Sequence, residues 1–295
     1  MKPILVEARR GRVVEAVHRV HAVASRDDEI VAAAGDVALA CFLRSSSKPL
    51  QAIPLARARD DLTDEDLAIA SASHRATPAQ VAAVRALLAK APASEDDLEL
   101  GPQEGRPPEP VYHNCSGKHA GMLALSRARG WETKGYRLPG HPVQEACRAV
   151  HAEAAGVDAA SMPAATDGCG VVTFALPLER MAHAFGRLES LPGGDRVARA
   201  VRARPDLVGG PDGADVRLML AAPGWIAKGG AEGVLCAAGP DGLGVALKTE
   251  DGASRAHLPA LAAFLARVGL ELPAFAVVPV TDSRGEEVGL LGVCL

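Results

Sequence analysis

A serine and a lysine lie three residues apart in the segment RSSSKPLQ, at Ser45 and Lys48. If a helix begins here, residues three apart share one face, and the lysine amine can act as the base for the serine hydroxyl. The S-x-x-K spacing at a helix start is typical of acyl-transfer enzymes. A capping serine beside a solvated lysine explains the same segment, and the segment taken alone favours that second interpretation.

A cysteine, a lysine and a histidine lie close together in the segment HNCSGKHAG. Cys115 stands at the expected start of a helix, where the helix dipole favours a thiolate, and Lys118 and His119 follow within one turn. A second thiol, Cys169, follows Asp167 in the segment TDGCGV. Two thiols could bind a soft metal such as zinc. A buried structural cysteine and a glycine-rich turn are the alternatives, and the sequence has no C-x-x-C motif to decide between them.

Two further segments could complete a Ser-Lys site. Ser73, in SASH, could relay protons, although a polar loop explains it equally well. Lys228 is followed by two glycines in KGGAEG, which predicts a strand edge that offers backbone N–H groups to an anion, with a glycine-rich turn as the alternative. The chain has 7 lysines against 25 arginines. Three of those lysines lie in these segments, which suggests amines that must be able to lose a proton.

The order of the predicted elements is strands, then helices, then strands and a late helix. Residues 1–45 have the alternating pattern of strands, with a short buried strand over 36–44. Helices are predicted from Lys48, with Pro54 as a kink or boundary, and after Thr77, Cys115 and His141. Residues 224–251 predict two strands joined at 240–242, and the last twenty residues predict a hairpin.

This order predicts an α+β fold with an antiparallel sheet assembled from both chain ends. Residues 1–50 and 222–295 form the sheet, residues 51–221 form a mainly helical inserted region, and residues 1–295 form a single catalytic unit.

The composition excludes several classes of partner. The chain is 48% hydrophobic and 23% charged with a net charge of −4, which is typical of a globular protein and gives no reason to expect nucleic acid. No apolar stretch approaches the roughly 20 residues that span a bilayer, so no membrane contact is expected. The first residues are charged, unlike a signal peptide. The six cysteines are widely spaced, which indicates reduced thiols, and we expect a cytoplasmic protein.

The combined order of these motifs resembles that of the class 3 (rhizobial-type, asparaginase II) L-asparaginases, which are similar to the serine β-lactamase and glutaminase fold. The motifs, in order, are RSSSKPLQAIPL, SASH, NCSGKHAGMLA, GHPVQ, TDGCGVVTFALPLERMA and KGGAEG. The resemblance covers most of the chain, and its most specific part is Asn114 to Met122. After SASH the family usually has Gly-Glu, where this chain has Arg75-Ala76.

The resemblance implies hydrolysis of L-asparagine to L-aspartate and ammonia, by a homodimer with no organic cofactor. It implies two catalytic pairs, Ser45 with Lys48 and Ser73 with Lys228. It also implies an auxiliary zinc site formed by Cys115, Lys118 and Cys169. Three further residues are expected near the substrate or the metal, and they are Arg44, His119 and Asp167. The alternatives are a glutaminase or another amidase on the same scaffold, and a non-catalytic zinc-binding or thiol-sensing protein.

Overall fold

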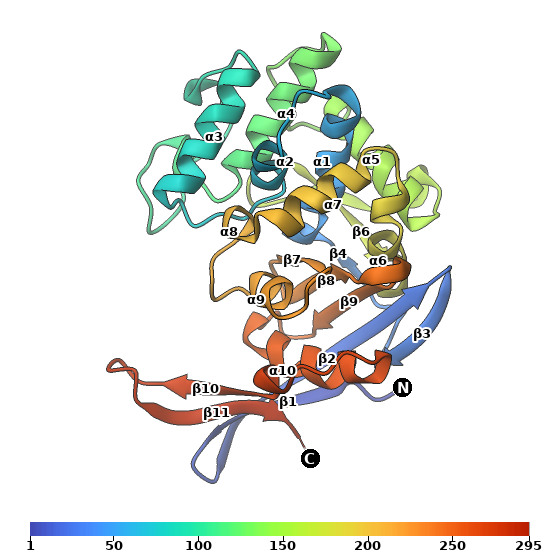
Figure 1. Ribbon diagram of the computed structural model, residues 1–295, viewed down its shortest axis with the longest axis vertical. Coiled ribbons are helices and arrows are strands. Elements are labelled where there is room, and N and C mark those ends of the chain that lie inside the picture. The colour runs from blue at the N-terminus through green and yellow to red at the C-terminus, as the bar shows by residue number, and fades with distance from the viewer. Residues whose placement is uncertain (295) are drawn as a thin grey trace.

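An antiparallel sheet built from both ends of the chain lies below a largely helical region (Figure 1). The computed structural model describes residues 1–294. The strand order is β10-β11-β1-β2-β9-β8-β7, and β3 pairs with β2. The strands are β1 (Ile4–Arg10), β2 (Val13–Arg26), β3 (Glu29–Ala34), β7 (Ile226–Gly230), β8 (Val234–Ala238), β9 (Gly244–Thr249), β10 (Val277–Thr281) and β11 (Glu287–Val293). The predicted α+β class with an antiparallel sheet is confirmed.

A second, smaller sheet lies next to the helices, with the strand order β4-β6-β5. It consists of β4 (Ala40–Phe42), β5 (Ala164–Thr166) and β6 (Val172–Pro177). The strand β6 is buried, whereas β4 is largely exposed, so the prediction of a buried strand over 36–44 is wrong. Among the described residues β4 pairs with β6 alone, and two of its three residues are exposed.

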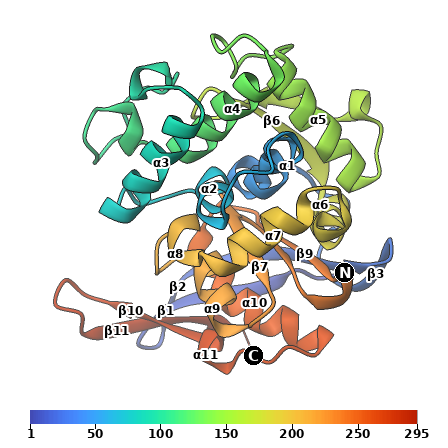
Figure 2. The ribbon, with the colours of Figure 1, turned by 45° about the horizontal axis from the view of Figure 1, so that its top comes forward.

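The helices cover the sheet and surround a central helix, α1. They are α1 (Lys48–Ala58), α2 (Asp64–Ala70), α3 (Pro78–Lys90), α4 (Ser116–Arg129), α5 (Pro142–Ala155), α6 (Leu178–Gly186), α7 (Gly194–Ala203), α8 (Pro205–Val208), α9 (Ala214–Ala221), α10 (His257–Leu265) and α11 (Pro273–Ala276). Figure 2 shows α1 enclosed by its neighbours, and it packs against α4, α5 and α7. Every residue of α1 from Lys48 to Ala56 is buried, so its first turn lies inside the protein.

Several predicted helix ends are confirmed by their caps. Thr77 and Gln80 form a capping box at the start of α3, with Pro78 in the first helical position. Gly130 and Gly156 end α4 and α5 in the left-handed conformation that favours glycine. Pro54, by contrast, is no boundary, because α1 continues through it to Ala58. The packing of α1 on three helices outweighs the one intrahelical hydrogen bond that the proline removes.

The region after α9 contains three strands rather than the two predicted ones. The turn at 240–242 joins β8 to β9 as expected, but a second tight turn separates β7 from β8. Glu232 and Gly233 have positive φ angles of 60° and 66° there, so the segment KGGAEG holds both the end of β7 and this turn.

The state of the cysteines and the lengths of the helices can be compared with the expectations from composition. All six cysteines are free thiols within residues 1–294. No helix within the same residues combines the length and the apolar character that crossing a bilayer requires.

Candidate active site

The three serines of RSSSKPLQ have different surroundings. They lie in a 3-10 turn, η1 (Arg44–Ser47), directly before α1. The hydroxyl of Ser46 donates to the Leu43 carbonyl at 2.7 Å, and that of Ser47 donates to the Arg44 carbonyl at 2.8 Å. Ser45 is the one of the three that lines a pocket of about 650 Å³. The local turn therefore engages two hydroxyls and directs the third toward the cavity.

Lys48 lies fully buried in the first turn of α1 and bonds to Ser73. Its Nζ donates to Ser73 Oγ at 2.9 Å and to the Ala72 carbonyl at 2.5 Å. Burial lowers the pKa of Lys48 to about 8, which favours the neutral amine that a base requires. Ser73 lines the same pocket as Ser45. Within residues 1–294 no hydrogen bond joins Lys48 to Ser45, so the geometry brings together Lys48 and Ser73.

Lys228 projects from β7 into the same pocket but bonds to an aspartate. Its Nζ donates to Asp215 Oδ2 at 3.1 Å and to the Gly229 carbonyl at 3.0 Å. Asp215 also accepts from the Gly229 backbone N–H at 2.9 Å. Although burial opposes it, the Lys228 ammonium and these N–H donors lower the pKa of Asp215. The structure therefore places Lys228 in an ion pair with Asp215, and within residues 1–294 no hydrogen bond joins Lys228 to Ser73.

Cys115, Lys118 and Cys169 form a separate buried cluster. Lys118 Nζ donates to Cys169 Sγ at 3.0 Å. A hydrogen bond with Cys169, together with the positive charges of Lys48 and Lys118, holds the pKa of Cys115 well below its usual range against the effect of burial. Burial alone would lower the pKa of Lys118, but the two neighbouring thiols outweigh it and raise this pKa. The cluster thus brings the Lys118 amine to the Cys169 sulfur, next to Cys115, at the N-terminus of α4.

His119, Asp167 and Arg44 lie around this cluster. Burial lowers the pKa of His119 to about 4; its Nδ1 is 2.6 Å from the Tyr136 hydroxyl, and its Nε2 has no partner within the described residues. Arg44 Nε donates to Asp167 Oδ1 at 2.7 Å. Arg44 has a φ of 53°, which places this non-glycine residue in the left-handed region directly before Ser45.

The cluster provides donors that suit zinc, but few of them. Thiolate sulfur is a preferred zinc ligand, and Cys115 is already biased toward the thiolate. Over residues 1–294 no group of three or more His, Cys, Asp or Glu side chains is arranged to hold a metal ion. A third ligand would therefore have to be a lysine amine that gives up its proton. On donor chemistry the residues fit a soft metal ion, with Lys118 as the ligand that must change its protonation state.

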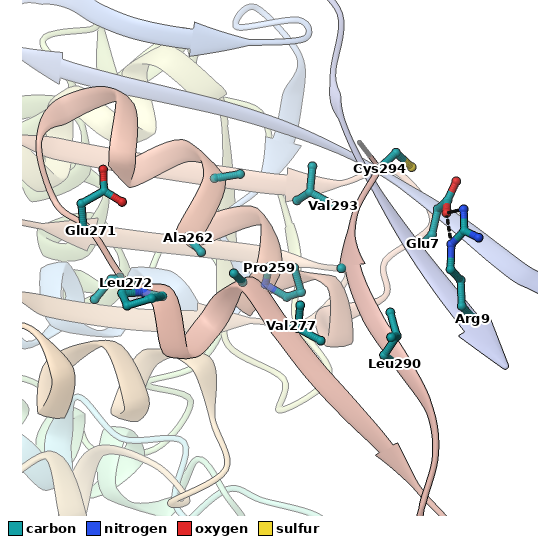
Figure 3. Close-up of a pocket in the computed structure, with 14 residues that line it drawn as sticks. Glu7, Arg9, Pro259, Ala262, Glu271, Leu272, Val277, Leu290, Val293 and Cys294 are labelled. Carbon is teal, nitrogen blue, oxygen red and sulfur yellow. Dashed lines mark hydrogen bonds and ion pairs between the residues drawn. The ribbon is translucent and has the colours of Figure 1, made fainter. Parts of the chain in front are cut away.

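The catalytic candidates and the thiol cluster face different openings. The pocket lined by Ser45, Ser73 and Lys228 does not include Cys115, Lys118 or Cys169. Cys169 instead lines a shallow opening with Glu99 and Arg137. A third cavity, of about 520 Å³, lies between α10 and the strands β1, β10 and β11 (Figure 3). It contains none of the predicted site residues.

Sequence reasoning missed Asp215 and Arg106. Asp215 lies in GGPDGADV, a glycine-rich segment whose composition indicates only a turn. Arg106 donates to the His74 carbonyl at 2.9 Å and lines the pocket from a proline-rich loop. The only sequence signal for Asp215 is an acidic residue in a glycine-rich stretch, where backbone can approach a ligand closely.

Comparisons with solved structures give only weak likenesses. Two crystal structures of a protein called Mglu, the first in its native form, are 13% and 14% identical to this chain, with TM-scores of 0.49 and 0.47. The matches cover 86% and 90% of this chain, and 65% and 72% of those chains. A beta-lactamase from Mycobacterium bovis is 17% identical with a TM-score of 0.32, over 79% of this chain and 88% of that one. These values are too low to carry an argument.

The comparison with protein families is more informative. None of the curated proteins matches this chain. The family described as L-asparaginase II matches residues 6–293, which is nearly the whole chain and includes every candidate site residue named above. The chain therefore belongs to the L-asparaginase II family of amide hydrolases.

Proposed function

We propose that the chain hydrolyses L-asparagine to L-aspartate and ammonia by Ser-Lys nucleophilic catalysis. The observation that carries the proposal is the hydrogen bond of 2.9 Å between buried Lys48 and Ser73, in a pocket that Ser45 and Lys228 also line. A hydroxyl becomes a nucleophile at neutral pH when a base accepts its proton, and a desolvated lysine amine is such a base.

Ser45 is the proposed nucleophile. Its oxygen attacks the side-chain amide carbon, and Lys48 accepts the hydroxyl proton, with Ser73 as the relay between them. The carbon–nitrogen bond then breaks, and the nitrogen leaves as ammonia after it takes a proton from the Ser73 and Lys228 side of the pocket. Water hydrolyses the resulting ester and regenerates the serine. Backbone N–H groups of η1 and β7 are the candidate donors to the oxyanion.

The alternative within the same chemistry is that Ser73 is acylated, because Lys48 contacts Ser73 directly. Ser45→Ala and Ser73→Ala, checked for an intact fold by circular dichroism, should each abolish ammonia release from asparagine. Acid-quenched wild type, digested and analysed by mass spectrometry, should carry the aspartyl group on the peptide with Ser45. An aspartyl group on Ser73 would reassign the nucleophile, and full turnover in both variants would contradict Ser-Lys catalysis.

Glutamine and other small amides are the nearest competing substrates. The pocket volume of about 650 Å³ accommodates a side chain one methylene longer than asparagine. A panel of asparagine, glutamine and simple carboxamides, scored by ammonia release, separates an asparaginase from a glutaminase. We expect the highest kcat/KM with asparagine or a close derivative.

An auxiliary zinc ion on Cys115, Lys118 and Cys169 is part of the proposal. Zinc bound there would supply a fixed positive charge near the substrate site, beside the Arg44–Asp167 pair. The support is the set of soft donors and the low pKa of Cys115. Elemental analysis should find zinc in the wild type and none in Cys115→Ser with Cys169→Ser. Equal metal content in the two proteins would remove the zinc site from the proposal.

The thiol cluster also supports the second candidate function, a zinc-binding or thiol-sensing protein without turnover. Such a protein would bind zinc, or oxidise Cys115 and Cys169 reversibly, but release no ammonia from any amide.

The motif resemblance supports four further proposals: a homodimer, a cytoplasmic location, class 3 membership and the serine β-lactamase-like fold. Analytical ultracentrifugation tests the first of these.

A further inference from the structure

The substrate pocket is positively charged within a chain that is negative overall. The chain has a net charge of −4. Five cationic side chains and two carboxylates line the pocket, and they are Arg75, Arg106, Arg217, Lys228 and Arg255, with Asp212 and Asp215. Because Asp215 is paired with Lys228, the remaining cations outnumber the remaining carboxylate. A pocket of this kind concentrates anions and repels cations.

Arg106 is fixed in place without an acidic partner. Its Nη1 donates to the Tyr112 carbonyl at 2.8 Å, and its Nη2 donates to the His74 carbonyl at 2.9 Å. Both acceptors are neutral, so these bonds orient the guanidinium without pairing it with a carboxylate. Because His74 directly precedes Arg75, the second bond places the Arg106 guanidinium beside the backbone of Arg75. Burial and the positive charge of Arg75 lower the pKa of Arg106.

The Arg75 side chain packs against Gly210, which also lines the pocket. A Cβ atom at Gly210 would stand 2.6 Å from Arg75 Nε, so a larger residue there would displace the Arg75 side chain. Within residues 1–294 neither Arg75 nor Arg106 forms an ion pair with a carboxylate. Most arginines that lie elsewhere on the surface are paired, for example Arg57 with Glu153 and Arg204 with Asp206.

The arginine pair is linked to the segment of the chain that contains Ser73, the proposed proton relay. Arg75 is two residues from Ser73, and Arg106 bonds to the residue between them. Two neighbouring guanidinium groups repel one another unless an anion lies between or beside them. Guanidinium groups bind carboxylates through paired, directional hydrogen bonds. A carboxylate of the substrate would relieve this repulsion and fix the distance of its amide from Ser73.

We propose that Arg75 and Arg106 form a carboxylate-binding subsite beside Ser73, and that it selects small amides of net negative charge, such as asparagine acylated on its α-amino group. This inference rests on the proposed amidase function and narrows its substrate class. Asp215 is paired with Lys228, so of the pocket carboxylates in the described structure Asp212 alone is left for a free ammonium group, against four cationic side chains that favour an anion. The pocket of about 650 Å³ has room for a small acyl group.

Three substrates that differ in charge test the selection. We expect wild-type kcat/KM, measured by ammonia release, to fall from N-acetyl-L-asparagine to L-asparagine to L-asparagine methyl ester. Arg75→Ala should lower kcat/KM for the two carboxylates by about 10-fold or more and leave the ester nearly unchanged. An equal loss with the ester, or a wild-type preference for asparagine over its N-acetyl derivative, would overturn the proposal.

A binding measurement separates this inference from the proposed reaction. N-acetyl-L-aspartate has no amide at the reacting position, so its binding by isothermal titration calorimetry does not depend on turnover. It should bind wild type and the control Arg284→Ala equally, bind Arg75→Ala about 10-fold more weakly or worse, and lose affinity with added salt. Equal binding to all three proteins would refute the subsite even if amides are hydrolysed. The expected pattern without any ammonia release would refute the reaction and keep the subsite.

Discussion

Asp215 is the residue that compensates the charge of Lys228 inside the pocket. Both side chains are buried, and the carboxylate bonds to the ammonium at 3.1 Å and to the Gly229 N–H at 2.9 Å. A Cβ atom at Gly213 would lie 2.5 Å from the Asp215 carboxylate, so this glycine makes room for it. A buried ammonium that loses its only carboxylate becomes an uncompensated charge. We infer that Asp215 positions Lys228 for the reaction.

Asp215→Ala should therefore lower the turnover of asparagine by about 10-fold or more, because the Lys228 ammonium loses a charge-assisted hydrogen bond. The small cavity left by the carboxylate should admit formate. We expect added formate, but not formamide, to restore part of the lost kcat, as measured by ammonia release.

The exposed residue Asp96 provides the control for this prediction, and Asp96→Ala should have wild-type kcat with no response to formate. Equal recovery with formate and formamide, or unchanged turnover in Asp215→Ala, would show that the carboxylate does not position Lys228.

Most of the candidate site residues could be proposed from local patterns in the sequence, but the contacts between them in the structure could not. S-x-x-K spacing, a cysteine at a helix start and a lysine before two glycines are local patterns with local chemical reasons. The bond between Lys48 and Ser73 depends instead on how the end of α2 approaches the start of α1, which is a matter of packing between helices. The same holds for Asp215, which lies thirteen positions before Lys228 in the chain.

The turn η1 and the strand β7 approach one another at Gly230. A Cβ atom there would lie 2.8 Å from the Leu43 carbonyl oxygen and 3.1 Å from the Ser46 nitrogen. An alanine must therefore push the two elements apart. Because η1 carries Ser45 and β7 carries Lys228, that displacement separates the proposed nucleophile from the opposite wall of the pocket.

Gly230→Ala should lower kcat for asparagine by about 100-fold, the order expected for a misplacement near 1 Å. The matched control is Gly101→Ala, where a Cβ atom would meet nothing within 4 Å. Steady-state kinetics on both variants, with circular dichroism for the fold, gives the measurement. Wild-type kcat in Gly230→Ala would show that this close contact does not set the position of Ser45.

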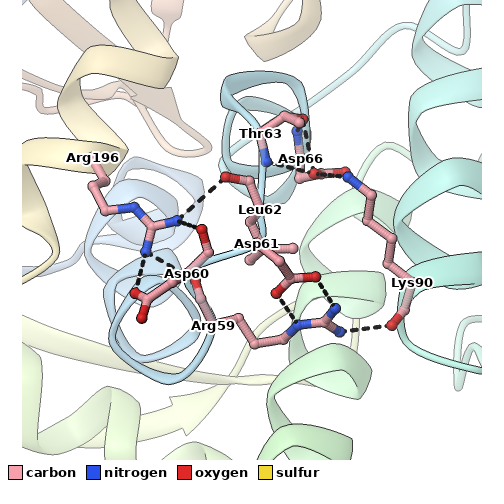
Figure 4. Close-up of polar contacts among 8 residues, drawn as sticks. All are labelled: Arg59, Asp60, Asp61, Leu62, Thr63, Asp66, Lys90 and Arg196. Carbon is pink, nitrogen blue, oxygen red and sulfur yellow. Dashed lines mark hydrogen bonds and ion pairs between the residues drawn. The ribbon is translucent and has the colours of Figure 1, made fainter.

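A network of polar contacts joins the end of α1 to the start of α2 (Figure 4). Arg196, on α7, donates to the Ala56 carbonyl at 2.7 Å and to the Arg59 carbonyl at 2.9 Å. Thr63 and Asp66 form a capping box at the start of α2, and Lys90 bonds to Asp66 at 2.5 Å. Since α1 begins with Lys48 and α2 leads to Ser73, this network fixes the two helices that supply the Lys48–Ser73 pair.

Arg196→Met should destabilise the protein by about 2 kcal/mol, because it leaves helix-end carbonyls without their charged donor. Urea denaturation followed by circular dichroism measures the change. Arg199→Met on the same helix is the control. The Arg199 side chain is 59% exposed and pairs with Asp64, so a loss below about 1 kcal/mol is expected. Equal losses in the two variants would contradict a specific role for Arg196.

Helices could be predicted more reliably than strands in this chain. Helix caps such as Thr77, Gly130 and Gly156 are single residues whose effect is local, and the structure confirms them. The exposure of β4 and the separation of β7 from β8 depend on which strands become neighbours. The number of strands in the last third was therefore mispredicted, although the antiparallel sheet itself was not.

Buried neutral histidines make the whole molecule sensitive to mild acid. His74 and His151 are fully buried, and burial lowers their pKa values from 6.5 to about 3 and about 4. Above pH 6.5 both histidines are neutral in the folded and the unfolded chain, so they do not lower the free energy of unfolding. Below pH 6.5 the unfolded chain binds protons that the folded chain does not. The full free energy of unfolding is therefore available above pH 6.5, and the contribution of these two histidines is lost as the pH falls toward about 4.

Between pH 7.5 and pH 5.5 each of these two histidines should lower the free energy of unfolding by about 1.4 kcal/mol. Urea denaturation at the two pH values gives the difference. His151→Met removes one such group, so its loss of stability over this range should be smaller than that of wild type by about the same amount. A wild-type free energy of unfolding that is constant from pH 7.5 to pH 5.5 would mean that His74 and His151 take up protons in the folded chain.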